Sequence, residues 1–395
     1  MAREYEAYHS GVPVPGTNVK IPMKLLVVEL NSFHFAILPM YEALLPSLFG
    51  GDTVTADYYL LPGFVDRAKY AVGPSVYPLN TPVLRFALPT KPLRSFFYRA
   101  RIQRLVDRLK PDAVVFNTVE PPAFLEVFRR VNHPLKIGVV HNPKRAGIDY
   151  QHRRQGELIF CLHEYNYRLL EKDKPVDGYL SPFYKYRTVD VREKSDDRLE
   201  IAVQGVISFN RRDYPGLVDL GRQLIQRPLT SRVIFNILGD ASLRDGPRLK
   251  QLVSQHGLKD LFRFHVDLPD SEFFNQLARS DYMMPLLHPN EHTYEGAAKV
   301  TMSYGHSGAY GIPLILHRRT ARLWGVPDDA CVAYDDMDEV VAFLVAHGRD
   351  SGDDMRRRYR ALIDDKIAEN HVFLRQLSQT HPALAARRSR RPDTS

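Results

Sequence analysis

Short apolar runs alternate with amphipathic stretches along almost the whole chain. In the first half, the runs KLLVVEL, DAVVFN, LKIGVV, LIFCL and DGYLS are separated by stretches with helical periodicity, such as 35–48 and 95–109. Such runs are typical of strands buried in a parallel sheet, and the stretches between them predict crossover helices. The first half therefore predicts a doubly wound α/β domain with right-handed crossovers.

The same alternation restarts after the polar segment VREKSDDR at 191–198. The runs LEIAVQG, RVIFNILG, FRFHV, DYMMPLL and PLILH follow, and a charged amphipathic stretch from Asp353 to Leu377 ends the pattern. A chain of 395 residues exceeds what one core usually organises. We expect two Rossmann-like domains, over 22–190 and 199–352, with a last helix over 353–378.

Both ends of the sequence lack this pattern. Residues 1–21 contain no apolar run suited to a signal peptide, and nowhere do about 18 apolar residues follow one another, so a cytoplasmic protein is expected. We expect 1–21 to be a flexible tail and 383–395 to be a disordered basic tail. The basic tail serves either solubility or a contact with the inner face of the membrane.

The charge balance narrows the choice of partners. With 54 Lys and Arg against 46 Asp and Glu, the net charge is +8, which favours anionic partners such as nucleotide phosphates. Nucleic acid is not expected, because basic runs interleaved with aromatic residues are missing outside the tail. Cys161 and Cys331 lie far apart without metal-ligand spacing and are predicted to be buried free thiols.

Ligands of open parallel sheets bind beyond the carboxyl ends of the strands, so the loops after the strands hold the candidate residues. In the first half these are His34, Glu120 and His141. In the second half they are Gly205, Arg211, Arg212 and Gly239.

The stretch EGAAKVTMSYGHSGAYGIPLIL, Glu295 to Leu316, predicts a helix that Gly311 and Pro313 end before an apolar strand. Glu295, Lys299, Ser303 and His306 stand three or four residues apart and so fall along one side of that helix. Because the helix lies between two buried strands, a polar stripe on it indicates a ligand more than a solvent-exposed ion pair.

Four stretches of the second half together resemble the donor-binding domain of GT-B glycosyltransferases of the family 4 or family 1 type. They are IAVQGVISFNRRDYPGLVDL, VIFNILGDA, DLPDSEFFNQLARSDYMMPLL and the Glu295–Leu316 stretch, in this order. The resemblance implies two Rossmann-like domains facing a central cleft, with the C-terminal helix crossing back to the first domain. Many retaining members carry two glutamates in the last stretch, and here Ser303 stands at the second position.

The resemblance also implies roles for the candidate residues. Lys299 would lie near the donor pyrophosphate, as would Arg211 or Arg212, and Glu295 would accept the hydroxyls of a ribose or sugar. Ser303 is either a donor contact or a packing residue, and His306 is expected to be structural. Gly205 and Gly239 would mark close backbone approaches to the donor. His141 is the first candidate for the acceptor base, with Glu120 and His34 as alternatives.

The leading hypothesis is a glycosyltransferase that moves a sugar from a nucleoside-diphosphate sugar to an acceptor hydroxyl, in surface polysaccharide or glycoconjugate synthesis. No metal and no cofactor besides the donor are expected, since no Asp-x-Asp motif lies in a suitable loop. The acceptor is a glycan, a lipid-linked molecule or a small molecule. A nucleotide-sugar epimerase of similar fold and a non-catalytic anion- or nucleic-acid-binding protein are the alternatives. The donor base, the sugar, the stereochemical outcome and the oligomeric state stay open.

Overall fold

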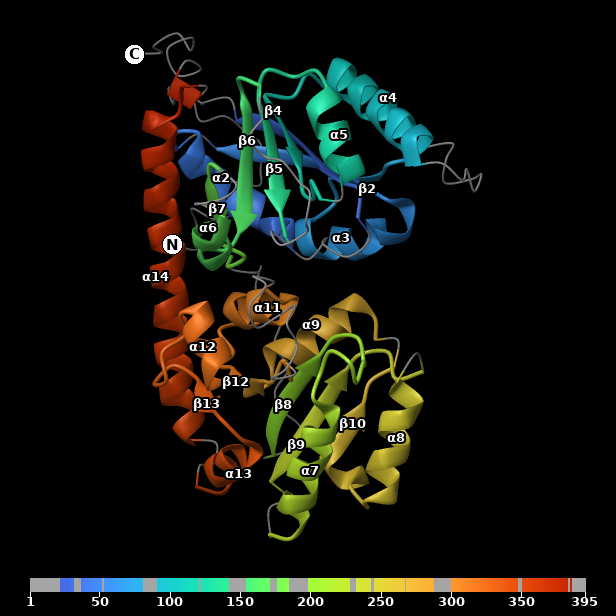
Figure 1. Ribbon diagram of the computed structural model, residues 1–395, viewed down its shortest axis with the longest axis vertical. Coiled ribbons are helices and arrows are strands. Elements are labelled where there is room, and N and C mark those ends of the chain that lie inside the picture. Colours follow the sequence, from blue (N-terminus) through green and yellow to red (C-terminus); the bar gives the residue numbers. More distant parts are fainter. Residues whose placement is uncertain are drawn as a thin grey trace, which may run out of the picture.

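The computed structural model describes residues 22–31, 37–51, 53–80, 91–120, 122–141, 154–170, 176–184, 198–227, 232–242, 245–266, 268–287, 300–346, 350–382 and 384–385. Two layered units lie one above the other along the long axis, and a long helix runs down one side of both (Figure 1). His34, Glu295, Lys299, the N-terminal tail and most of the expected linker at 191–198 lie outside the described residues.

The first unit is built on a parallel sheet of seven strands in the order β3-β2-β1-β4-β5-β6-β7. The strands are β1 (Met23–Glu29), β2 (Val54–Leu60), β3 (Val76–Pro78), β4 (Ala113–Phe116), β5 (Lys136–Val140), β6 (Glu157–Leu162) and β7 (Gly178–Leu180). The helices are α2 (Pro39–Leu48), α3 (Val65–Val72), α4 (Lys91–Leu109), α5 (Pro122–Arg130) and α6 (Glu164–Leu170), with a short 3-10 turn at Pro62–Phe64.

Helices cover both faces of this sheet, which explains why its strands are almost entirely apolar. Along β1, Leu25 and Val27 belong to the core on the side of α2, whereas Leu26 and Val28 belong to the core on the side of α4 and α5. Alternate side chains of a strand point to opposite faces, so both faces need apolar residues.

The second unit contains a parallel sheet in the order β10-β9-β8-β11 and a parallel pair β12-β13. A bridge between Met283 and Leu314 connects the two sets of strands. The strands are β8 (Leu199–Gln204), β9 (Val233–Leu238), β10 (Phe262–Phe264), β11 (Tyr282–Met283), β12 (Ile315–His317) and β13 (Val332–Tyr334). The helices are α7 (Tyr214–Ile225), α8 (Gly246–Gln255), α9 (Asp270–Ala278), α11 (Met302–Tyr310), α12 (Arg318–Trp324) and α13 (Met337–Ala346), with a 3-10 turn at Lys259–Leu261.

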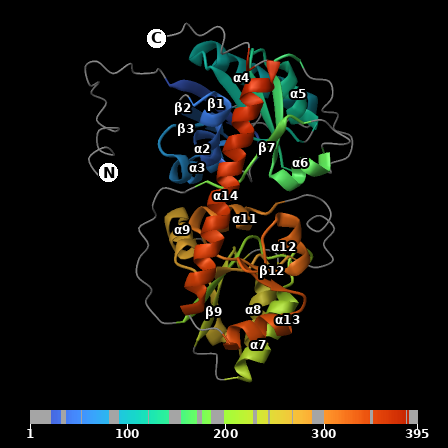
Figure 2. The same ribbon diagram turned by 90° about the vertical axis from the view of Figure 1, so that its left-hand side faces the viewer.

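Helix α14 (Asp350–Thr380) packs on both units, as the view in Figure 2 shows. Its first half places Tyr359 and Ile363 in a core of the second unit, and Leu374 lies in a core of the first. Between them, the side chain of Asn370 accepts a hydrogen bond from the backbone of Ser181 at 2.9 Å and donates one to the carbonyl of Tyr179 at 3.0 Å. The last helix thus crosses back to the first domain.

Several expectations are confirmed and two need correction. The two parallel α/β units are present, and Cys161 and Cys331 are buried free thiols. Residue Leu384, expected in the loose tail from 383, instead packs in the first core at 3% exposure. The helix expected from Glu295 begins only at Met302, because Thr301 has an extended backbone (φ −82°, ψ 152°). Among the helices that the structure describes, none combines the length and apolar character needed to cross a bilayer.

Candidate functional site

Helix α11 lies where the carboxyl ends of the two sheets meet (Figure 1). On the side of the first domain, His163 follows β6, and its ring lies 5.5 Å from the ring of Tyr304 on α11. On the side of the second domain, Gln204 ends β8, and its amide lies 2.8 Å from His306 Nδ1. Residues at both carboxyl edges therefore gather around this helix, which is where a parallel sheet binds ligands.

A buried polar cluster occupies the carboxyl edge of the first sheet. Glu29 ends β1 and Asn117 follows β4, the neighbouring strand at which the strand order reverses. The carboxylate of Glu29 accepts hydrogen bonds from the Asn117 amide and from the Thr118 hydroxyl, the latter at 3.1 Å. The Asn117 side chain also accepts a hydrogen bond from Tyr41 of α2. The cluster fixes the two loops on either side of the switch point.

His141, the first candidate for the acceptor base, lies in the same cluster. Its backbone N–H donates to Glu120 Oε1 at 2.7 Å, and its Nε2 is hydrogen-bonded to the backbone carbonyl of Asn117. A carbonyl oxygen only accepts, so Nε2 carries the proton and Nδ1 keeps the lone pair in the neutral ring. The structure therefore brings His141 and Glu120 together.

Burial changes the acidity of this cluster. Loss of solvation raises the pKa of Glu29 to about 8, against the opposing effect of the hydrogen bonds from Asn31, Asn117 and Thr118, while the charge of Glu120 raises it further. Burial and the nearby Glu29 also hold the pKa of Tyr41 well above its usual range. A carboxyl group that titrates near neutral pH is typical of functional sites, although ion-pair networks produce it as well.

In the second domain, two glycines and one arginine pack closely together at the loop after β8. Gly205 has a φ of 115°, and a Cβ added there would overlap the guanidinium of Arg212. A Cβ on Gly239, after β9, would overlap the carbonyl oxygen of Gly205. Arg212 is half-buried and donates to the carbonyl of Pro285, whereas Arg211 is exposed. Arg212, Gly205 and Gly239 thus lie together at the carboxyl edge of this sheet.

The polar stripe expected along one helix is only partly formed within the described residues. Ser303 and His306 lie on α11 and are 2% and 3% exposed, and burial lowers the pKa of His306 to about 4. A histidine in this environment is neutral at physiological pH, which agrees with a structural role. Helix α11 begins at Met302, and Glu295 and Lys299, the other two members of the expected stripe, lie outside the described residues.

Two residues of the first-domain cluster, Glu29 and Asn117, were not predicted from the sequence. Both were counted within apolar strand runs, KLLVVEL and DAVVFN. A carboxylate or amide in a strand that is buried on both faces needs hydrogen-bond partners, so each was itself a signal. Within the described ranges, no group of three His, Cys, Asp or Glu side chains is placed to hold a metal ion.

No protein-family model matches the chain, and no curated protein matches it in sequence. Solved structures do match it over nearly the whole length. A glycosyltransferase from Rickettsia africae ESF-5 is similar with a TM-score of 0.62 and 11% identity, over 93% of this chain and 99% of that chain. Anabaena HepE, solved with UDP and glucose, has a TM-score of 0.55 and 11% identity, over 92% and 100% of the two chains.

A protein from Listeria monocytogenes named for UDP-N-acetylglucosamine 2-epimerase activity is also similar, with a TM-score of 0.52 and 12% identity, over 88% of this chain and 95% of that chain. At such identities the likeness shows the fold. The chain has the GT-B fold, two Rossmann-like domains with a C-terminal helix that returns to the first, and this fold is shared by glycosyltransferases and nucleotide-sugar epimerases.

Proposed function

We propose that this protein is a glycosyltransferase that moves a sugar from a nucleoside-diphosphate sugar to an acceptor hydroxyl. The observation that carries the proposal is the GT-B fold, shared with a glycosyltransferase over 93% of this chain at a TM-score of 0.62. A fold alone does not define a reaction. Support at the level of residues comes from the two polar groups at the carboxyl edges, His141 with Glu120 and Arg212 with Gly205.

The donor belongs to the second domain. HepE, which shares the fold, was solved with UDP and glucose, and a nucleoside diphosphate needs cations and open backbone where its phosphates lie. Arg212 supplies a guanidinium that the Pro285 carbonyl holds in place, and Gly205, which has no side chain, leaves the room that this guanidinium occupies. We assign the phosphate contact to Arg212 and Lys299, whose charges balance the leaving diphosphate without a metal. Glu295 takes the sugar or ribose hydroxyls.

The acceptor belongs to the first domain, with His141 as its base. The imidazole of His141, held by the carbonyl of Asn117, takes the proton of the acceptor hydroxyl. The carboxylate of Glu120 accepts a hydrogen bond from the backbone N–H of His141, and its negative charge favours the imidazolium that forms on His141. The reaction takes place in the cytoplasm, in the synthesis of a surface polysaccharide or glycoconjugate, and the basic tail touches the inner face of the membrane.

A panel of nucleoside-diphosphate sugars tests the proposal. We expect one donor to bind in calorimetry and to release its diphosphate slowly in the absence of an acceptor. Lys299→Ala should weaken donor binding about tenfold or more while the fold is kept, because a charge-assisted hydrogen bond is lost. Unchanged donor binding by this variant would remove Lys299 from the site.

The epimerase is the second candidate, because the Listeria protein shares the fold. The same panel separates the two functions. An epimerase would convert the sugar while it is still attached to the nucleotide, whereas a transferase would separate sugar from diphosphate. Failure of every donor to bind would favour a non-catalytic binding protein.

A further inference from the structure

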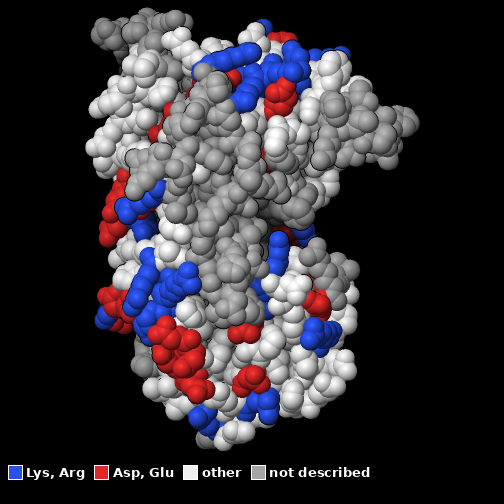
Figure 3. Space-filling view, in the orientation of Figure 1, with Lys and Arg blue, Asp and Glu red and all other residues white. Residues whose placement is uncertain are grey.

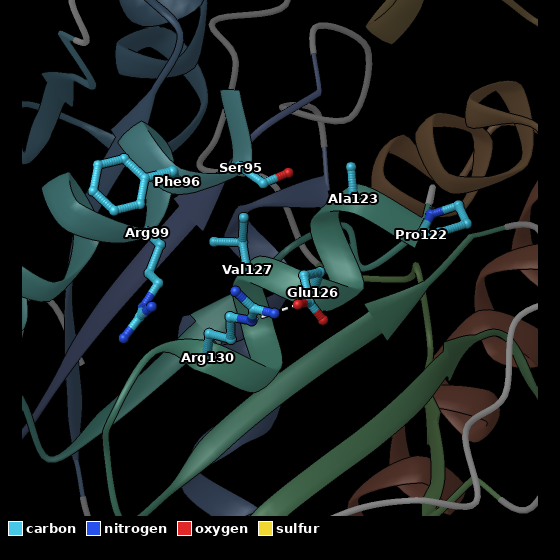
Figure 4. Close-up of a pocket in the computed structure, with 8 residues that line it drawn as sticks. All are labelled: Ser95, Phe96, Arg99, Pro122, Ala123, Glu126, Val127 and Arg130. Carbon is cyan, nitrogen blue, oxygen red and sulfur yellow. Dashed lines mark ion pairs between the residues drawn. The ribbon is translucent and has the colours of Figure 1, made fainter. Parts of the chain in front are cut away.

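A groove between α4 and α5 lies outside the hydrogen-bonded cluster at the carboxyl edge. It encloses about 430 Å³ and is lined by Ser95, Phe96 and Arg99 of α4 and by Pro122, Ala123, Glu126, Val127 and Arg130 of α5. Figure 4 shows Phe96 and Arg99 at one end of the groove and Pro122 at the other. The volume falls within the range of about 300–1,000 Å³ that is usual for small-molecule sites.

One end of the groove is apolar. Phe96 is 60% exposed, which is unusual for a phenylalanine, and the rest of the apolar lining comes from the almost fully buried Val127 and, toward Pro122, from Ala123. Exposed aromatic surface in a concave site is unfavourable in water, and the apolar part of a ligand would cover it. The groove is therefore suited to a hydrocarbon chain at this end.

The cation beside Phe96 is Arg99. Arg130 forms an ion pair with Glu126 across one turn of α5. Arg99 is exposed, and within the described part of the chain it has neither an ion pair nor a hydrogen bond to another side chain. A guanidinium in this state is suited to a phosphate, which it binds through two parallel hydrogen bonds. Figure 3 shows further Lys and Arg side chains gathered over the end of the first domain that is farthest from the second.

The other end of the groove lies next to the candidate site. Pro122 is the first residue of α5 and follows Glu120 by two residues, so their Cα atoms are at most about 7 Å apart. The middle of the groove, between Pro122 and Arg99, contains the Ser95 hydroxyl and the Glu126 carboxylate. These are hydrogen-bonding groups suited to sugar hydroxyls.

We propose that the groove binds the acceptor, and that the acceptor is an anionic amphiphile carried on an apolar chain. The chain covers Phe96, the phosphate binds Arg99, and the head group runs toward Pro122 and the Glu120–His141 pair. This assignment rests on the proposed sugar transfer for its meaning as an acceptor site. The occupant of the groove is a single amphiphile, not a bilayer surface.

The test is calorimetry of the full chain with n-decyl phosphate, below its micelle concentration, and with inorganic phosphate. Arg99→Ala should weaken decyl phosphate binding about tenfold, and Phe96→Ala should weaken it several-fold, because each removes one half of the contact. Arg104→Ala is the matched control, since Arg104 is an exposed arginine of the same helix that does not line the groove. We expect it to bind like the wild type, and inorganic phosphate to bind far more weakly.

Three results would overturn the inference. Absence of saturable decyl phosphate binding would do so, as would equal losses in Arg99→Ala and Arg104→Ala, which indicate general attraction to charge. Inorganic phosphate that binds as tightly as decyl phosphate would show an anion site without a chain. Because no donor is present, these results do not depend on turnover. If the protein transfers sugar to a soluble acceptor but does not bind decyl phosphate, only the assignment of the groove is refuted. If it binds decyl phosphate but turns over no donor, only the proposed sugar transfer is refuted.

Discussion

The guanidinium of Arg212 lies directly over Gly205, in the space that a side chain at position 205 would occupy. The backbone of Gly205 in turn approaches Gly239 so closely that a Cβ on Gly239 would overlap its carbonyl oxygen. The carboxyl ends of β8 and β9 are therefore packed around a cation, and the two glycines are needed to keep that cation at the edge of the sheet.

Gly205→Ala should lower the free energy of unfolding by about 2 kcal/mol or more, because it combines backbone strain at φ 115° with displacement of Arg212. The matched control is Gly51→Ala. Gly51 has a φ of 87°, but nothing lies within 4 Å of an added Cβ, so only the backbone strain of about 1 kcal/mol is expected. Urea unfolding of the two variants measures the difference. Equal losses would mean that Arg212 moves aside without cost.

Lys136→Met should destabilise the first domain by about 3–5 kcal/mol, because it leaves a buried carboxylate without its cation. Lys136 Nζ lies 2.8 Å from Glu157 Oε1, both side chains are at most 3% exposed, and the same ammonium donates to the carbonyls of Phe128 and Val131 at the end of α5. Lys24→Met is the control, since the Lys24–Asp57 pair is 3.6 Å apart and Lys24 is 44% exposed. The free energy of unfolding of Lys24→Met should fall by no more than about 1 kcal/mol. Denaturant midpoints of similar size for the two variants would contradict the burial of the Lys136–Glu157 pair.

Stability should fall as the pH falls below about 6.5, partly through His306. Burial lowers the folded pKa of His306 to about 4 from 6.5, and its ring packs between Gln204, Phe273 and Phe274, none of which is charged. Between these pH values, His306 binds a proton in the unfolded chain but not in the folded chain. The stability that is present above pH 6.5 is therefore lost toward pH 4. From about pH 7 to about pH 5, wild type should lose about 1–2 kcal/mol more than His306→Gln. Parallel pH profiles in urea would show that the imidazole is not shielded from water.

His141→Ala should depress sugar transfer by about a hundredfold or more while donor binding changes little, because general base catalysis typically contributes about that much and the proposed donor site is on the other domain. Transfer is measured with the donor found in the panel, and donor binding by calorimetry. Equal losses in transfer and donor binding would indicate a structural role for His141. Full transfer activity would pass the role to Glu120 or His34.

Removal of α14 should unfold the first domain as well as abolish transfer. A chain that ends after Gly348 lacks Asn370, Leu374 and Leu384, which complete the contacts of β7 and the first core. A chain that ends after Ala386 keeps α14 and Leu384 and lacks only residues 387–395, so it should melt like the full chain. Thermal melting followed by circular dichroism compares the two. An unchanged first-domain transition in the shorter chain would refute the role of the helix.

Much of the fold could be predicted because the strands are buried on both faces. A strand such as β1 is apolar without interruption from Leu25 to Val28, and this gives a run that stands out against amphipathic helices. The same apolar character of the strand runs made the polar residues of the candidate site difficult to recognise from the sequence. Glu29 and Asn117 lie at strand ends within such runs, and only the structure shows that Thr118 and Tyr41 satisfy their buried polar groups.

The start of α11 could not be read from periodicity. Glu295 and Lys299, which lie outside the described residues, fit the helical spacing of Ser303 and His306, but Thr301 adopts an extended backbone and α11 begins after it. Local spacing indicates which residues would share a face if the helix continued, and tertiary contacts decide whether it does. The pairing of Gln204 with His306, 102 residues apart, is likewise a product of the fold.

The shared helix α14 also sets the order in which the protein can mature. The first domain is translated before the second, and domains generally fold as they emerge. Here Leu374 and Leu384 pack in a core of the first domain, although they are synthesised after the entire second domain. A nascent first domain therefore has an apolar face exposed for the time it takes to make roughly 200 further residues, at about 5–20 residues per second. During that interval the emerging chain presents a surface that chaperones recognise, and the last helix ends it.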